Sequence, residues 1–281
     1  MSGPLAERLA VCSWSLGPSD PDDLIGQMRQ IGINRIQLGL DPLRSDAAWA
    51  DTGGKLADAG IGIVSGMFGC EGEDYSTLDT IKVTGGIVPD ATWETNWANI
   101  QATVPIAKSL GISLVSFHAG FLPEEPGDPA YEKLVGRLTQ IAQAFAAEGI
   151  DLSFETGQEE AGTLKGFLDR LAQPNVGVNF DPANMILYAK GDPVESVRVL
   201  MGYLKGVHVK DATPTQTPGE WGAEVPVGTG AVDWTAFLTA LNEGGFAGAM
   251  AIEREAGDQR VADIRTAKEF VLETIEKAGL S

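Results

Sequence analysis

A short apolar run, Val176 to Phe180, ends abruptly in Asp181 and is followed at once by Pro182. Such a run is typical of a buried parallel strand, and proline cannot continue it. Asp181 is therefore predicted at the carboxyl end of a strand. Three other apolar runs carry metal-capable side chains at or near their carboxyl ends, and these are Glu155, His208 and Glu253.

A recurring Gly-Ile pair indicates how these strands are connected. It stands at Gly32-Ile33, Gly60-Ile61, Gly111-Ile112 and Gly149-Ile150, each time between a helical pattern and a strand-like run. Glycine just past a helix adopts the left-handed cap, and isoleucine then opens the next strand. Eight strand–helix units follow, which predicts an α/β fold, a (β/α)8 TIM barrel. The alternative, an open doubly wound sheet, requires a glycine-rich turn after the first strand, and the segment 12–17 is not one.

The expected strands are 9–14, 33–38, 61–67, 112–120, 150–155, 176–181, 204–211 and 248–253. Helices are expected over about 21–31, 47–59, 161–172 and 258–278, and four more, one that holds Trp93 and Trp97 and three that start at Pro129, Asp192 and Asp233. Two connections, Phe68–Ala91 and Ala212–Val232, are too long for ordinary turns. We expect both to lie over the barrel mouth and Trp221 to approach the site; the alternative is surface loops without such a role.

Length and charge limit the classes of function. A barrel needs roughly 250 residues, so the 281 residues, 43% of them hydrophobic, form one domain over 1–281. The 20 Lys and Arg against 39 Asp and Glu give a net charge of −19, which repels nucleic acid and anionic membranes, although acidity can also serve solubility alone. Only Cys12 and Cys70 are present, and no signal segment or spanning run is seen, so a cytoplasmic protein is expected.

The active site of such a barrel lies at the carboxyl ends of its strands, where Glu155, Asp181, His208 and Glu253 would converge. Three carboxylates that face one another repel unless a cation lies among them. Three oxygen donors and one imidazole suit one divalent ion, Mn²⁺ first, with Mg²⁺, Co²⁺ or Zn²⁺ tolerated. The alternative is four separate capping or salt-bridged residues.

A cation with open positions would bind two neighbouring substrate oxygens and acidify the C–H next to a carbonyl. Glu155 and Glu253 would then move the proton as base and acid. His118 either contributes a further acid/base or substrate contact or is only hydrogen-bonded at the rim. Lys210 either binds substrate or pairs with Asp211, and Trp14 either stacks on a substrate or fills the barrel top.

Five segments together resemble the xylose-isomerase-like superfamily of TIM barrels, in its sugar phosphate isomerase/epimerase family: 154–158, 179–184, 208–211, 227–234 and 252–255. The resemblance covers nearly the whole chain. It implies a divalent metal on Glu155, Asp181, His208 and Glu253, with the two glutamates flanking the substrate carbon. It implies a metal-dependent isomerase or epimerase of a keto-sugar, sugar phosphate or keto-polyol that works through a metal-bound enediolate. The implied partner is a small carbohydrate, and homo-oligomerisation is left open.

Three positions depart from the pattern of the ketose 3-epimerases in this superfamily. Ala161 replaces a glutamate, Asn184 a histidine and Pro214 an arginine. The substrate clamp must therefore differ, and we expect it to use Trp14, His118, Asn184, Lys210 and Trp221.

Three other functions remain open. A lyase or dehydratase acting on an inosose or 3-keto-glycoside would form the same enediolate and then eliminate, with His118 as the added acid. A nuclease of this superfamily would need more histidines than the two present. A non-catalytic binding barrel would not need an intact set of ligands.

Overall fold

The computed structural model describes residues 4–123, 127–217 and 219–280. Eight parallel strands close into a barrel, in which each strand pairs with the next and the last, β10, pairs with β1. They are β1 Leu9–Cys12, β2 Arg35–Gly39, β3 Gly62–Met67, β4 Leu114–Phe117, β5 Asp151–Glu155, β6 Val176–Phe180, β7 Leu204–Val209 and β10 Ala249–Ile252. The predicted (β/α)8 barrel is confirmed.

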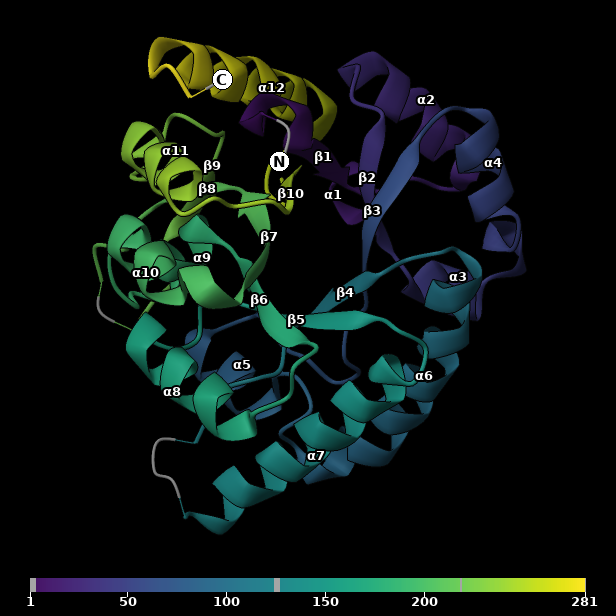
Figure 1. Cartoon of the computed structure of the whole chain (residues 1–281), viewed down its shortest axis with the longest axis vertical. Coiled ribbons are helices and arrows are strands. Elements are labelled where there is room, and N and C mark those ends of the chain that lie inside the picture. The colour runs from purple at the N-terminus through teal and green to yellow at the C-terminus, as the bar shows by residue number, and fades with distance from the viewer. Residues whose placement is uncertain (1–3, 124–126, 218, 281) are drawn as a thin grey trace.

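Helices surround the barrel on its outside (Figure 1). The long ones are α2 Pro21–Ile31, α6 Asp90–Ser109, α7 Pro129–Ala146, α8 Ala161–Leu171, α10 Pro193–Leu200, α11 Trp234–Glu243 and α12 Arg260–Lys277. Shorter ones are α1 Ser13–Leu16, α3 Asp41–Ser45, α4 Thr52–Asp58, α5 Leu78–Thr84 and α9 Pro182–Leu187, with 3-10 turns η1 Leu5–Arg8, η2 Ala47–Trp49 and η3 Met201–Tyr203.

Aspartates start several of these helices, as the sequence indicates. Asp20 accepts from the amides of Asp22 and Asp23, and Asp128 and Asp192 cap α7 and α10 in the same way. Gly32 ends α2 with φ of 71°, the left-handed conformation that glycine adopts without steric cost. At the recurring Gly-Ile pairs, the glycine therefore follows the end of a helix and the isoleucine precedes a strand.

Several predicted elements differ from the observed ones. The expected first strand ends at Cys12, because Ser13–Leu16 forms the helix α1, which Gly17 closes in the left-handed region. The helix expected over 47–59 is a 3-10 turn, 47–49, followed by α4, and the break falls at residues 50 and 51, where Asp51 is the N-cap of α4. The strand expected over 204–211 ends at Val209, and Asp211 begins a separate strand.

The two long connections contain secondary structure of their own. Residues 68–91 include the helix α5, which starts at a capping box between Thr77 and Thr80. Residues 212–232 are organised by an antiparallel pair, β8 Asp211–Thr213 and β9 Ala223–Val225.

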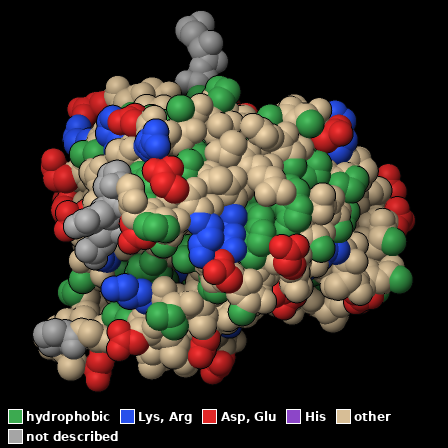
Figure 2. Space-filling model, turned by 90° about the horizontal axis from the view of Figure 1, so that it is seen from below, with side chains coloured by type: hydrophobic (Ala, Val, Ile, Leu, Met, Phe, Trp, Pro, Cys, Tyr) green, Lys and Arg blue, Asp and Glu red, His purple; other side chains and the backbone are tan. Residues whose placement is uncertain are grey.

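The acidic excess does not form a uniform field on the face seen in Figure 2, where Asp and Glu lie among Lys, Arg and neutral side chains. Across the described ranges, no helix combines the length and the hydropathy needed to cross a bilayer.

Candidate metal centre and active site

Four predicted ligands meet at the carboxyl end of the barrel. Glu155 is the last residue of β5, Asp181 follows β6, His208 lies in β7 and Glu253 follows β10. One ligand atom from each lies within 4.8 Å of the others, and all four side chains are buried. The convergence predicted from the sequence is therefore present.

His208 is oriented by residues on the far side of its ring. Its Nε2 lies 2.9 Å from the Gln37 carbonyl oxygen and 2.9 Å from the Asn179 amide. Irregularities in the strand register fall beside both residues, between Ile36 and Gln37 and between Val178 and Asn179, and such bulges re-aim side chains. Gln37 Oε1 can only accept, so it favours a proton on Nε2 and a free Nδ1 lone pair for a ligand, whereas Asn179 Nδ2 can only donate and favours an unprotonated Nε2.

The Nδ1 atom of His208 faces the three carboxylates. It lies 3.4 Å from Glu155 Oε1, 3.6 Å from Asp181 Oδ2 and 3.4 Å from Glu253 Oε2. His208 Nδ1, Glu155 Oε2 and Asp181 Oδ2 are buried and make no hydrogen bond with the described residues. Buried polar atoms rarely lack partners, and a cation among the four residues would satisfy His208 Nδ1 and Asp181 Oδ2, while Glu155 Oε2 lies on the side of His118. The residues present therefore fit a bound metal.

The candidate ligands are hard donors, oxygen and imidazole nitrogen, without a thiolate. Cys12 lies within reach of His208 and Glu253, but burial raises the pKa of its thiol to about 12, and the thiol points toward the Gln37 carbonyl oxygen at 3.5 Å. The remaining donors are three carboxylates and one imidazole, which suit Mn²⁺ or Mg²⁺ better than a thiolate-binding metal.

The electrostatics of the four residues also favour positive charge among them. Burial opposes the charged form of His208, but the carboxylates of Glu253 and Glu155 outweigh it and raise its pKa well above the usual value. Burial likewise opposes ionisation of Glu253, yet Lys210 and His208 hold its pKa well below normal. Burial raises the pKa of Asp181. A cation would take the place of the imidazole proton.

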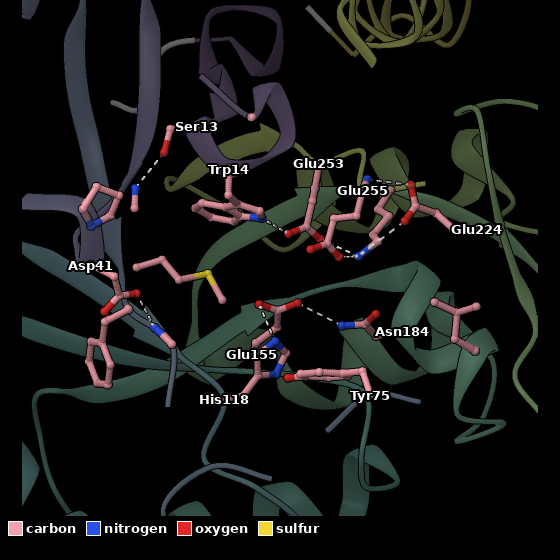
Figure 3. Close-up of a pocket in the computed structure, with 18 of the residues that line it drawn as sticks. Ser13, Trp14, Asp41, Tyr75, His118, Glu155, Asn184, Glu224, Glu253 and Glu255 are labelled. Carbon is pink, nitrogen blue, oxygen red and sulfur yellow. Dashed lines mark hydrogen bonds and ion pairs between the residues drawn. The ribbon is translucent and has the colours of Figure 1, made fainter. Parts of the chain in front are cut away.

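The two glutamates are held differently (Figure 3). Glu253 accepts from Trp14 Nε1 at 2.6 Å through Oε1 and from Lys210 Nζ at 2.8 Å through Oε2. Glu155 accepts from Asn184 Nδ2 at 2.9 Å through Oε1, and its Oε2 lies 3.5 Å from His118 Nε2. All the predicted substrate-binding residues except Trp221 therefore contact a candidate metal ligand.

These residues open into a cavity of about 710 Å³, within the size range of small-molecule sites. Its lining includes Trp14, His118, Asn184, Lys210 and Trp221. The first long connection contributes Phe68, Gly69 and Tyr75, and the second contributes Trp221 and Glu224. Both connections therefore lie at the mouth, as expected, and Trp221 packs edge-on against Tyr188.

Asp211 holds the second connection in place. Its carboxylate is 1% exposed and accepts from five donors at 2.9–3.2 Å: the amides of Ala212, Gly228, Gly230 and Val232 and the Trp234 indole. A Cβ on Gly230 would stand 2.1 Å from Asp211 Oδ1, so only glycine allows this approach. The expected alternative, an ion pair of Lys210 with Asp211, is not what the structure places there, because Lys210 binds Glu253 and Glu255.

Sequence reasoning missed several residues of the site, namely Gln37, Asp41, Tyr75, Asn179, Glu224 and Glu255. Gln37 and Asn179 are polar positions inside predicted strands, and that breach of the apolar pattern was an available signal. Glu255 stands two positions after Glu253. Tyr75 and Glu224 lie in the long connections, whose sequence carries no comparable signal.

Comparisons with known proteins agree with this architecture. The family model described as a xylose isomerase-like TIM barrel matches residues 25–274. A crystal structure of a xylose isomerase domain protein from Planctomyces limnophilus is 30% identical, covers 97% of this chain and 98% of that chain, and superposes with a TM-score of 0.86.

Two curated relatives are more distant. An L-ribulose 3-epimerase from Mesorhizobium japonicum is 23% identical over 259 residues, which is 86% of this chain and 78% of the relative. SgbU of Escherichia coli K12, described as an L-ribulose-5-phosphate 3-epimerase, is 24% identical over 190 residues, so the match spans 64% of this chain and 65% of that protein, less than two thirds of either. On the match over residues 25–274 and the likeness to the Planctomyces protein, the chain belongs to the xylose isomerase-like TIM barrel family.

Proposed function

We propose that the protein is a divalent-metal-dependent epimerase or isomerase of a keto-sugar, sugar phosphate or keto-polyol. One observation carries this proposal: three buried atoms without hydrogen-bond partners among the described residues, His208 Nδ1, Asp181 Oδ2 and Glu155 Oε2, lie where Glu155 and Glu253 meet a cavity of about 710 Å³. The activity of the Mesorhizobium relative, an L-ribulose 3-epimerase, supports the same class.

Glu155, Asp181, His208 and Glu253 would hold the cation, with Mn²⁺ as the preferred ion. When bound, the cation supplies positive charge that stabilises the enediolate left after a proton is removed next to a substrate carbonyl.

Glu155 is the better base of the two glutamates. Its Oε2 accepts no hydrogen bond from the described residues, whereas both oxygens of Glu253 are occupied by Trp14 and Lys210. Asn184 fixes the orientation of the Glu155 carboxyl, and His118 lies on the side of its free oxygen. Glu253, from a strand on the other side of the cluster, would deliver a proton of its own to the opposite face of the substrate carbon, while Glu155 keeps the proton that it removed, and Lys210 would balance the charge left on Glu253.

The aromatic lining would exclude water and position the sugar. Trp14, Tyr75, Tyr188 and Trp221 surround the opening, and aromatic faces cover apolar C–H groups at low entropic cost. A dry cavity strengthens the electrostatic interactions at the carboxylates.

The test is hydrogen exchange. The Mn²⁺-loaded protein, incubated with a panel of ketoses and ketose phosphates in D₂O, is expected to place deuterium on the carbon next to the carbonyl and to form an epimer or isomer. Glu155→Gln is expected to abolish both exchange and turnover, and Glu269→Gln on the outer helix α12 is the matched control. Loss of water or of an aglycone, seen by mass spectrometry, would contradict the proposal and indicate elimination.

Metal removal gives an independent test. EDTA is expected to abolish activity and lower the melting temperature, because a ligand of the native state stabilises it. Mn²⁺ is expected to restore both. If neither EDTA nor Mn²⁺ changes the melting temperature, the four residues do not share a cation.

A further inference from the structure

At the rim of the barrel, side-chain carboxylates of the chain accept hydrogen bonds from backbone N–H groups of the loops. In TIM barrels, phosphates are commonly held by the loops after the seventh and eighth strands, where free amides point at the anion. In this protein those strands are β7 and β10.

After β7, the amides are occupied. Asp211 accepts from Gly228, Gly230 and Val232. The two amides between them, of Thr229 and Ala231, donate to the carbonyls of Pro226 and Ala212. Each amide from 228 to 232 therefore already has an acceptor within the chain.

After β10, the amides of the three residues that follow Glu253 are also occupied. The Arg254 amide donates to Ser15 Oγ at 3.0 Å. The amides of Glu255 and Ala256 donate to Glu224 Oε1 at 3.0 and 3.3 Å. Glu224 is fixed in turn by Arg254, whose guanidinium lies 2.8 Å from the same oxygen. A phosphate here would have to displace a carboxylate that is itself ion-paired.

The pattern continues around the mouth. Asp41 accepts from the Gly69 amide at 2.8 Å, and Asp181 from the Asn184 amide at 3.0 Å. These carboxylates take the positions at which a bound anion would otherwise be recognised.

The cavity also lacks a free cation. Five carboxylates line it: Asp41, Glu155, Glu224, Glu253 and Glu255. Within the described ranges, Lys210 is the one Lys or Arg of the lining, and it lies 2.8 Å from both Glu253 and Glu255. With a divalent cation on its four ligands the lining remains net negative. A neighbouring hollow holds Lys82 and Lys190, but with Asp79, Glu159 and Glu160 beside them.

We infer that this site takes an uncharged ketose or keto-polyol and discriminates against phosphate esters. The inference rests on the proposed function and narrows its substrate class. A phosphate monoester carries a charge of about −1.5 to −2 at pH 7, so it meets repulsion from the lining and finds the amides of 228–232 and 254–256 already bonded. Hydroxyl groups, by contrast, can both donate to the lining carboxylates and accept from Lys210.

The experiment compares pairs that differ only in the phosphate. With the Mn²⁺-loaded full chain, kcat/KM is measured for L-ribulose, D-fructose and D-psicose and for the matching phosphate esters. The free sugars are expected to exceed their esters by on the order of tenfold or more. Added KCl is expected to raise kcat/KM for the esters and to leave that for the free sugars unchanged, because salt screens repulsion.

A charge-removing variant tests the cause. Glu255 is half-exposed, and glutamine there keeps an acceptor for Lys210 while removing one negative charge. Glu255→Gln is expected to raise the ratio of ester to free-sugar kcat/KM roughly 2–5-fold. Glu269→Gln, which removes the same charge from an exposed position on α12 outside the cavity, is expected to leave the ratio unchanged.

Binding gives a readout that does not depend on turnover. Free ketoses are expected to raise the melting temperature more than their esters or inorganic phosphate at equal concentration. Esters that are turned over as well as free sugars, or that stabilise the protein as strongly, overturn this inference and leave the epimerase proposal intact. Absence of exchange with every ketose instead contradicts the epimerase proposal, and the melting temperatures still decide which class binds.

Discussion

Replacing Asp211 by asparagine tests how the second long connection is held. The carboxylate is buried and accepts through Oδ2 from Gly228, Gly230 and Trp234, and through Oδ1 from Ala212 and Val232. Asparagine has one oxygen and one NH₂ group. Whichever way it turns, its NH₂ faces at least two of these donors, which then lose their acceptor.

The magnitude follows from that count. A buried donor left without an acceptor costs about 1–3 kcal/mol, so two donors cost about 2–6 kcal/mol, before the weaker bonds of a neutral oxygen are added. For a chain of this size 1 kcal/mol corresponds to roughly 2–4 °C. We expect Asp211→Asn to lower the melting temperature by roughly 4–24 °C.

The matched control is Asp233→Asn, the same change at the start of α11. Asp233 is exposed and accepts one hydrogen bond, from the Ala236 amide. Asparagine is an equally good N-cap, so the expected change is within about 0.5 kcal/mol. Both variants are melted by circular dichroism in EDTA, which removes metal binding from the comparison. An Asp211→Asn protein that melts no lower than Asp233→Asn would refute the reasoning.

Three further predictions concern the metal, the mouth and pH. Gln37→Leu removes the acceptor at His208 Nε2, and we expect Mn²⁺ affinity measured by calorimetry to fall about 10–100-fold; unchanged affinity would show that Gln37 does not orient the ligand. Trp221→Ala is expected to raise KM or lower kcat without lowering the melting temperature, and unaltered kinetics would remove the connection from the site. Burial raises the pKa of Glu159 to about 7. The neutral carboxyl therefore adds to the stability of the fold, by at most about 3 kcal/mol. This contribution is complete below the unfolded pKa near 4.5 and is lost as pH rises through about 7. Glu159→Gln, which can still accept from the Leu122 amide, is expected to flatten the decline in melting temperature between pH 5 and pH 8, and an equally steep decline would contradict this assignment.

The barrel and the four candidate ligands were predictable because their signals are local. A buried parallel strand is an apolar run, and Asp181 before Pro182 marks where one ends. Once eight such units close into a barrel, the carboxyl ends must meet. Geometry then brings Glu155, His208 and Glu253 together without any information about their individual contacts.

The rest of the site depends on contacts between distant parts of the chain. Trp14 is in a helix rather than a strand, and its indole donates to Glu253, 239 residues away. Glu224 reaches the amides after β10 only because the β8–β9 pair folds back, and strands of three residues are too short to show an alternating pattern. The capping box at Thr77 and Thr80 was a local signal for α5, but nothing in it indicates that Tyr75, just before it, lines the cavity.

The closure of the barrel by β1 and β10 has a consequence for biosynthesis. β10 is the last barrel strand to leave the ribosome, and it completes the sheet by pairing with the first. Until then β1 and β7 are unpaired edges, which are open to association with other chains. Glu253 follows β10 directly, so a nascent chain that ends before it lacks one of the four ligands. Cation binding would therefore stabilise the finished barrel, with its four ligands, more than a chain that has only three of them.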